Sequence, residues 1–164
     1  MIVQVYPGNN MTQNPANMSK EEAELAFKKW SQTEYVKISK YCNSKGYRVS
    51  RVIQSKCQSL PPMLAVWYVK TDDKDTDLWV ISGEFPTDLA SSKIAKNARE
   101  ALRHFSMSWH IQAAKLEDGV AEGKFELGDE ATQTKFAKEL TARAEGLYEL
   151  YNSDKLWEAS GLTL

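Results

Sequence analysis

Cysteine is scarce in this chain: Cys42 and Cys57 stand alone, without the C-x-x-C spacing of a metal or redox site. Two cysteines are too few for a disulfide scaffold or a structural zinc site, so we expect free thiols in a reducing cytoplasm and no bound metal. The sequence also contains no run approaching the roughly 18 apolar residues of a membrane-spanning helix. Its first residues lack a cationic region followed by an apolar one, which predicts no signal peptide and no membrane association.

Cofactor-binding and catalytic motifs are absent as well. The chain has no G-x-x-x-x-G-K-[ST] loop, no G-x-G-x-x-G turn and no G-x-S-x-G elbow, so the corresponding nucleotide-binding and hydrolase classes are not indicated. We therefore predict no cofactor. The net charge is only −1, and the aromatic residues are not interleaved with lysine and arginine, which argues against nucleic acid as a partner.

The charge is nevertheless unevenly distributed along the chain. Residues 115–164 hold six basic and eleven acidic residues, and the compensating basic residues lie mainly between Arg48 and Arg103. Such an asymmetry can attract a small anionic ligand, although a mildly polarised surface is the simpler interpretation.

The N-terminal part of the chain predicts a lead-in and then a helix. Residues 1–18 are rich in proline, glycine and asparagine, which is typical of a flexible segment, with 2–6 as a candidate edge strand, before a single domain at 19–164. Ser19 and Glu22 form a capping box that starts a helix, and a glycine at position 46 ends it. The apolar stripe shifts near residues 31–33, which leaves one long helix or two short ones as alternatives.

Three strands are expected next, at residues 49–57, 63–69 and 78–85, with proline or polar turns between them. The middle one reads M-L-A-V-W-Y-V and is apolar on both faces, which is typical of a central strand. A meander places it between the other two strands. Either helices cover both of its faces, or one face is buried in a homodimer.

Two long helices complete the expected fold. A cap at Thr87, Asp88 or Ser91 starts the first, whose apolar face extends over 94–116, and Asp129 starts the second. We expect the apolar residues of the C-terminal tail to dock on the core. The predicted class is α+β: an N-terminal helix, a three-stranded antiparallel β-meander and two long C-terminal helices packed on the sheet.

Four acidic residues between the last two strands have the spacing of a calcium loop. Asp73, Asp75, Asp77 and Glu84 fall at positions 1, 3, 5 and 12 of such a loop. Its sixth position requires a glycine for a sharp turn, however, and Leu78 occupies it. A solvated acidic hairpin tip is the better interpretation.

The segment 82–104 is where we most expect a site, because a strand, a polar turn and a cationic helix follow one another. Glu84 and His104 are the candidates for proton transfer. The candidates for binding a small anion or another ligand are Asp88, Arg99, Arg103, Trp79 and Trp109. A free helix N-terminus would assist them. The alternative is a structural turn, in which Gly83 allows another backbone or a ligand to approach closely.

Arg51 is an unusual residue in this pattern. By alternation it shares a face of the first strand with Val49 and Ile53, so its charge points toward a covered face and needs a partner. Glu84 on the third strand is the candidate partner. The pair is either a buried salt bridge or part of a ligand pocket.

Two runs within residues 79–116 carry a resemblance. W-V-I-S-G-E-F-P-T-D at 79–88, followed by A-R-E-A-L-R-H-F-S-M-S-W at 98–109, resembles a family of short bacterial proteins without an assigned function. The resemblance implies a bacterial cytosolic source and a compact α+β domain. It supplies no catalytic residues.

Two hypotheses for the function follow. The first is a small non-enzymatic interaction or regulatory protein of bacteria, which binds a protein partner or a second copy through an aromatic-rich surface or through the helix at 93–116. The second is a small anionic-ligand-binding protein or an enzyme that uses the strand-helix junction at 82–104. In the second, the candidate acid, base and arginine residues must converge in one concave pocket.

Overall fold

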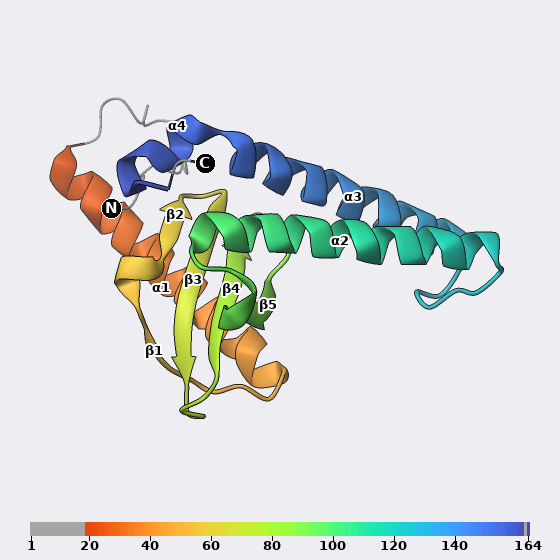
Figure 1. Ribbon diagram of the computed structural model, residues 1–164, viewed down its shortest axis with the longest axis horizontal. Helices are drawn as coiled ribbons and strands as arrows, with labels where there is room; N and C mark the ends of the chain where they lie inside the picture. The colour runs from red at the N-terminus through yellow and green to blue at the C-terminus, as the bar shows by residue number, and fades with distance from the viewer. Residues whose placement is uncertain (1–18, 163) are drawn as a thin grey trace.

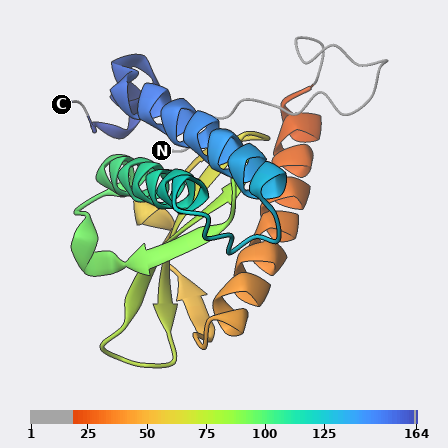
Figure 2. The ribbon, with the colours of Figure 1, turned by 90° about the vertical axis from the view of Figure 1, so that its right-hand side faces the viewer.

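The computed structural model describes residues 19–162 and 164, and it has three layers (Figure 1). A five-stranded antiparallel sheet lies in the middle, with one long helix on one face and two long helices on the other (Figure 2). The expected α+β class, with one helix before the sheet and two long helices after it, is confirmed. The flexible lead-in expected at 1–18, and the edge strand expected within it, lie outside the described residues.

The first helix, α1 (Lys20–Ser44), begins where the capping box predicts. The Ser19 hydroxyl accepts a hydrogen bond from the Glu22 backbone N–H at 3.1 Å, and the Glu22 carboxylate accepts one from the Ser19 N–H at 3.4 Å. α1 is one continuous helix, and Gly46 follows it with a φ of 89°. A residue without a Cβ adopts this conformation easily, so local sequence determines both ends of the helix.

The sheet has five strands rather than the three expected. They are β1 (Val49–Val52), β2 (Gln58–Leu60), β3 (Leu64–Thr71), β4 (Asp77–Gly83) and β5 (Asp88–Ser91), in the order β1-β3-β4-β5, with β2 also paired to β3. The strand expected at 49–57 ends at Val52, because the short 3-10 helix η2 (Gln54–Lys56) follows, and β2 lies just beyond the expected range. β1 and β2 pair with opposite ends of the same strand, β3.

The cap predicted within residues 87–91 is wrong, because this segment forms β5. Asp88 lies opposite Ile81 of β4 in the antiparallel pairing. The helix that follows, α2 (Ala98–Ala121), starts only after its N-cap residue Asn97. Backbone hydrogen bonds along the otherwise free edge of β4 outweigh the local capping preference. A strand therefore separates the two halves of the expected strand-helix junction.

β3 is apolar on both faces, and helices cover both of them. On one face, Ile38 and Cys42 of α1 pack against Val69, Leu78 and Val80. On the other face, a larger core joins the sheet to α2 and α3 (Glu130–Asn152); its large buried side chains include Trp79, Ile81, Leu102, Phe105, Trp109 and Leu147. Successive residues of β3 and β4 thus serve two separate cores, as alternation along a strand requires.

α2 and α3 lie side by side and extend together beyond the sheet (Figure 1). The second of them begins as predicted, because Asp129 caps α3 by accepting a hydrogen bond from the Thr132 N–H at 2.7 Å. After α3 the chain folds back through α4 (Asp154–Trp157) and the 3-10 helix η4 (Glu158–Ser160). Trp157 is buried in the larger core, which confirms that the tail docks on it.

Arg99 lies where α2 meets this tail, and only 2% of its surface is exposed. Its guanidinium donates hydrogen bonds to the backbone carbonyls of Leu162 at 2.6 Å and Tyr151 at 2.9 Å, and to the Asp154 carboxylate at 2.8 Å. Arg103, one turn later, is exposed. The two arginine candidates of this helix therefore have different surroundings, because Arg99 is a buried structural residue and Arg103 faces solvent.

Gly83 ends β4 at a close contact between two backbones. Its φ is 112°, and an added Cβ would overlap the Met63 carbonyl and lie 2.9 Å from the Leu64 Cα. The buried Glu34 carboxylate of α1 accepts a hydrogen bond from the Gly83 N–H at 3.0 Å and pairs with Lys37 at 2.9 Å. Of the two roles predicted for this glycine, the structure shows the close approach of another backbone.

We expect Arg99→Ala to lower the free energy of unfolding by about 2–4 kcal/mol, because two buried carbonyls lose charged donors and the guanidinium leaves a cavity. The matched control is Arg103→Ala on the same helix, which should change it by no more than about 0.5 kcal/mol. Urea unfolding of both variants measures the difference. Equal, small effects would contradict the buried role of Arg99.

We expect Gly83→Ala to destabilise the fold by about 3 kcal/mol, because it combines an unfavourable φ with a backbone overlap. Gly123→Ala is the matched control, since Gly123 also has a positive φ, of 72°, but an added Cβ there meets nothing within 4 Å. The control should cost about 1 kcal/mol. Thermal unfolding of both variants separates the two contributions, and identical losses would rule out the overlap.

Candidate functional site

The structure brings two of the expected ligand-binding residues together. Asp88 on β5 accepts hydrogen bonds from the Trp109 indole N–H at 2.9 Å and from the Tyr41 hydroxyl at 3.4 Å. Burial and the nearby Asp88 carboxylate raise the pKa of Tyr41 above its ordinary value. Because Trp109 belongs to α2 and Tyr41 to α1, Asp88 links helices from both outer layers at the edge of the sheet.

The other three ligand-binding candidates lie elsewhere. Trp79 is inside the larger core, where its indole N–H donates to the Ala95 carbonyl at 3.1 Å. Arg99 is held by the C-terminal tail, and Arg103 is exposed. The five side chains therefore do not converge on one concave site.

The two candidates for proton transfer have structural surroundings. Glu84 is exposed just after β4, and its backbone N–H donates to the Met63 carbonyl at 2.9 Å. His104 is half-buried beside the Phe105 ring, with the ring centroids 5.9 Å apart. These contacts hold the chain in place and do not assemble an acid-base pair.

Arg51 does not point toward a covered face, so that prediction is wrong. The register of β1 against β3 shifts between Val49 and Arg51, and the Arg51 side chain is exposed. A β-bulge of this kind reverses the face on which the following side chains lie. Arg51 is therefore solvated and needs no buried partner, and its candidate partner Glu84 is itself exposed.

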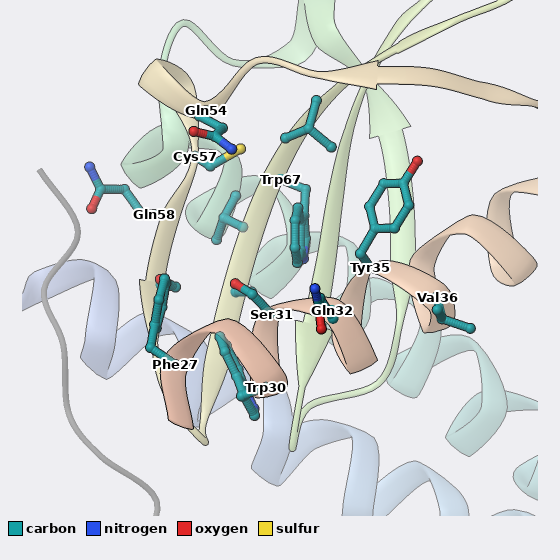
Figure 3. A pocket seen from close by; sticks show the side chains of 14 residues that line it. Phe27, Trp30, Ser31, Gln32, Tyr35, Val36, Gln54, Cys57, Gln58 and Trp67 are labelled. Carbon is teal, nitrogen blue, oxygen red and sulfur yellow. The ribbon is translucent and has the colours of Figure 1, made fainter. Parts of the chain in front are cut away.

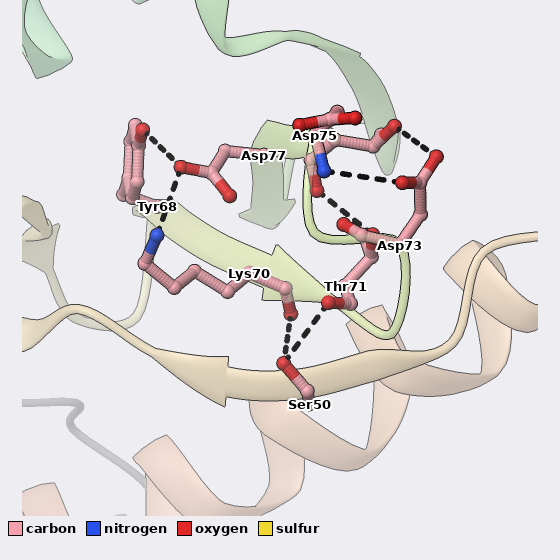
Figure 4. Close-up of polar contacts among 8 residues, drawn as sticks. Ser50, Tyr68, Lys70, Thr71, Asp73, Asp75 and Asp77 are labelled. Carbon is pink, nitrogen blue, oxygen red and sulfur yellow. Dashed lines mark hydrogen bonds and ion pairs between the residues drawn. The ribbon is translucent and has the colours of Figure 1, made fainter.

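The acidic residues between β3 and β4 form a hairpin closed by its own hydrogen bonds (Figure 4). Asp73 accepts hydrogen bonds from the Asp75 N–H at 3.1 Å and the Thr76 hydroxyl at 2.8 Å. Asp77 accepts one from the Tyr68 hydroxyl at 2.7 Å and pairs with Lys70 at 3.3 Å. Within the described part of the chain, no three His, Cys, Asp or Glu side chains gather around a position for a metal ion.

The hairpin couples stability to pH. The Tyr68 hydroxyl, together with Lys70, holds the pKa of Asp77 below its ordinary value of 3.8. A carboxyl whose pKa is lower in the folded state contributes stability that is present above its unfolded pKa and is lost as the pH falls through its folded pKa. This contribution therefore begins to decline near pH 4 and is gone once the pH is below the folded pKa of Asp77.

We expect the free energy of unfolding of Asp77→Asn to fall less steeply than that of the wild type as the pH is lowered below about 4, because the variant has no carboxyl to protonate at this position. Tyr68→Phe should reduce the steepness of this fall in part, since it removes the main donor and lets the pKa of Asp77 rise. Urea unfolding at a series of pH values from 7 to about 2 measures both profiles. Three parallel profiles would contradict the coupling.

Sequence reasoning missed a hollow that lies between α1 and the β1–β2 side of the sheet (Figure 3). Its volume is about 610 Å³. Four aromatic side chains line it: Phe27, Trp30 and Tyr35 from α1, and Trp67 from β3. All the other lining residues are uncharged, and they are apolar, hydroxyl, amide or thiol side chains.

The aromatic wall is held in a defined arrangement. The Trp67 indole N–H donates to the buried Ser82 hydroxyl at 3.0 Å, and its ring lies 6.3 Å from the ring of Tyr35. On α1, the ring centroids of Phe27 and Trp30 are 6.2 Å apart. The cleft is therefore lined by rings that touch neighbouring rings before any ligand enters.

The cleft opens because only part of α1 packs tightly on the sheet. Glu34, Ile38 and Cys42 in its C-terminal half are buried against β3 and β4. Phe27 and Trp30, earlier in the helix, are only half-buried. The shift of the apolar stripe near residues 31–33 falls between these two groups, so it is the feature of the sequence that marks the cleft.

Cys57 is the cleft residue with the most reactive functional group, but its surroundings suppress that reactivity. Its Sγ donates to the Ile53 carbonyl at 3.4 Å and accepts from the Tyr68 N–H at 3.3 Å. Burial raises the pKa of this thiol above its ordinary value, so it stays protonated at neutral pH. A protonated thiol is a weak nucleophile, which leaves binding as the chemistry that this cleft can perform.

No helix in the described part of the chain combines the length and the apolar character needed to cross a membrane. In comparisons with known proteins, neither a curated protein nor a solved structure matches the chain. A family model described as "Domain of unknown function (DUF4826)" matches residues 24–157, a region that contains the cleft, the whole sheet and both long C-terminal helices. The chain therefore belongs to the DUF4826 family, which confirms the expected resemblance to a family without an assigned function.

Proposed function

We propose that this protein is a non-enzymatic binding protein that takes a neutral, mostly apolar ligand into the cleft between α1 and the sheet. One observation carries the proposal: a hollow of about 610 Å³ is lined by four aromatic side chains and by no charged side chain. Ligand sites in proteins are usually clefts of roughly 300–1,000 Å³ with apolar walls and a few polar groups. The cleft has both properties.

The chemistry of the walls selects for a neutral ligand. Apolar surface of the aromatic side chains that is removed from water on binding contributes about 25 cal/mol of favourable free energy per Å². A charged ligand would instead lose its hydration without gaining a counter-ion, which is costly. The cleft therefore supports an uncharged occupant better than the anion considered for residues 82–104.

Binding without catalysis fits the placement of the reactive groups. The Cys57 thiol is protonated and engaged in two hydrogen bonds, and Glu84 and His104 do not line the cleft. A nucleophile needs an adjacent base to become active. Within the described residues, the walls of the cleft supply no carboxylate and no imidazole.

The proposal includes the reducing cytoplasm of a bacterium as the place of action. Cys42 and Cys57 are both free thiols, and burial raises the pKa of Cys42 to about 11. Free, protonated thiols are typical of reducing compartments.

We expect the full chain to bind N-phenyl-1-naphthylamine, a neutral dye, and to bind its sulfonated analogue 8-anilino-1-naphthalenesulfonate at least about tenfold more weakly. Trp30→Ala should weaken binding of the neutral dye about tenfold, because a wall of the cleft is lost. Dye fluorescence during titration measures both affinities. The matched control is Tyr148→Ala on α3, an exposed aromatic residue with one aromatic neighbour, which should leave binding unchanged.

Three outcomes would overturn the proposal. Tighter binding of the sulfonated dye would favour an anionic ligand. Equal losses in Trp30→Ala and Tyr148→Ala, or no binding of the neutral dye at all, would remove the cleft as the binding site.

A further inference from the structure

Ser59 carries a buried polar atom that lacks a partner. The residue lies on β2 with 9% of its surface exposed, and its Oγ forms no hydrogen bond with any described residue. Nearly all buried polar groups in folded proteins are hydrogen-bonded, because an unpaired one destabilises the fold. Ser59 therefore requires a specific explanation.

The Ser59 side chain belongs to the cleft. In the antiparallel register Ser59 lies directly opposite Ala65 of β3, so both side chains lie on the same face of the sheet. Trp67, two residues after Ala65, lies on that face as well, and all three residues line the hollow. Ser59 thus lies on the sheet face that bounds the cleft, the same face as Trp67, with its unpaired Oγ buried there.

Other polar groups of the cleft are either occupied or at its rim. The Cys57 thiol already donates one hydrogen bond and accepts another. Gln32 and Gln54 are exposed, so water satisfies their amides. Ser59 is consequently the lining residue whose side-chain hydrogen-bonding capacity is buried and unused.

We infer that Ser59 Oγ is the polar anchor of the ligand, which is a neutral molecule with a flat ring system and a hydroxyl or carbonyl oxygen at one end. The inference rests on the proposed function and specifies its ligand class. Rings prefer offset or edge contacts with Phe, Tyr and Trp, which the four aromatic walls provide. The oxygen completes the hydrogen bond that Ser59 lacks, so a ligand without it leaves the hydroxyl unpaired.

The test compares two probes that differ by one hydroxyl, naphthalene and 2-naphthol. Each is titrated into ¹⁵N-labelled full-length protein, and the amide shifts of Cys57 and neighbouring residues give the affinity and the location. In the wild type, the ratio of the two affinities should favour 2-naphthol. In Ser59→Ala this preference should fall about three- to tenfold, the effect of one hydrogen bond.

Ser39→Ala is the matched control. Ser39 Oγ is also buried and without a partner among the described residues, but Ser39 does not line the cleft. This variant should keep the wild-type preference for 2-naphthol. Both variants remove only one hydroxyl that makes no hydrogen bond, so both should melt at or above the wild-type temperature, which verifies that they fold.

The outcomes separate the inference from the proposed function. If both probes bind in the cleft and Ser59→Ala retains the wild-type preference, the cleft is a binding site but Ser59 is not its anchor, and the inference is overturned. If neither probe shifts the amides around Cys57, the cleft does not bind such rings, and the proposed function falls with the inference. If the preference for 2-naphthol over naphthalene is lost in Ser59→Ala and kept in Ser39→Ala, the result supports both the inference and the proposed function.

Discussion

The need to cover β3 on both faces shapes the whole molecule. This strand pairs with β1, β2 and β4 and carries apolar side chains on its two faces, so each face must be buried. On one face two long helices supply ample cover. On the other face only α1 is available, and a helix about 10 Å wide lies over four strands whose outer axes are about 14 Å apart. The cleft is the geometric consequence of covering a sheet with one helix.

Features that depend on neighbouring residues were predictable from the sequence. The capping box at Ser19, the glycine after α1 and the Asp129 cap all act within one turn of chain, and the structure has them where the sequence predicts. β5 could not be predicted in this way, because Asp88 is compatible both with the N-cap of a helix and with a position in a strand. Asp88 is in a strand because β5 pairs with the free edge of β4, and a local sequence pattern does not show that this edge is available.

The candidate site was harder to predict for the same reason. Arg99 looks like a surface residue until the tail, more than 50 positions away, folds over it. Phe27 and Trp30 of the cleft follow a regular helical stripe, so their spacing does not distinguish them from core residues. Only the shift of that stripe near residues 31–33 indicates that the two halves of α1 face different surroundings, and a shift alone does not say which half leaves the sheet.

Two departures from ordinary packing lie together at the cleft. α1 leaves the rings of Phe27 and Trp30 partly exposed to solvent, and β2 leaves the Ser59 hydroxyl without a partner, although burying both would stabilise an isolated domain. Other buried polar groups are hydrogen-bonded: Arg99 has three acceptors, and the Trp67 indole donates to Ser82. Ser39 Oγ on α1 is an exception that lies outside the cleft. Departures scattered at random would indicate loose packing. The half-exposed rings and the unpaired Ser59 hydroxyl around one uncharged hollow are the observations from which we propose a ligand site, since functional sites are where proteins sacrifice stability.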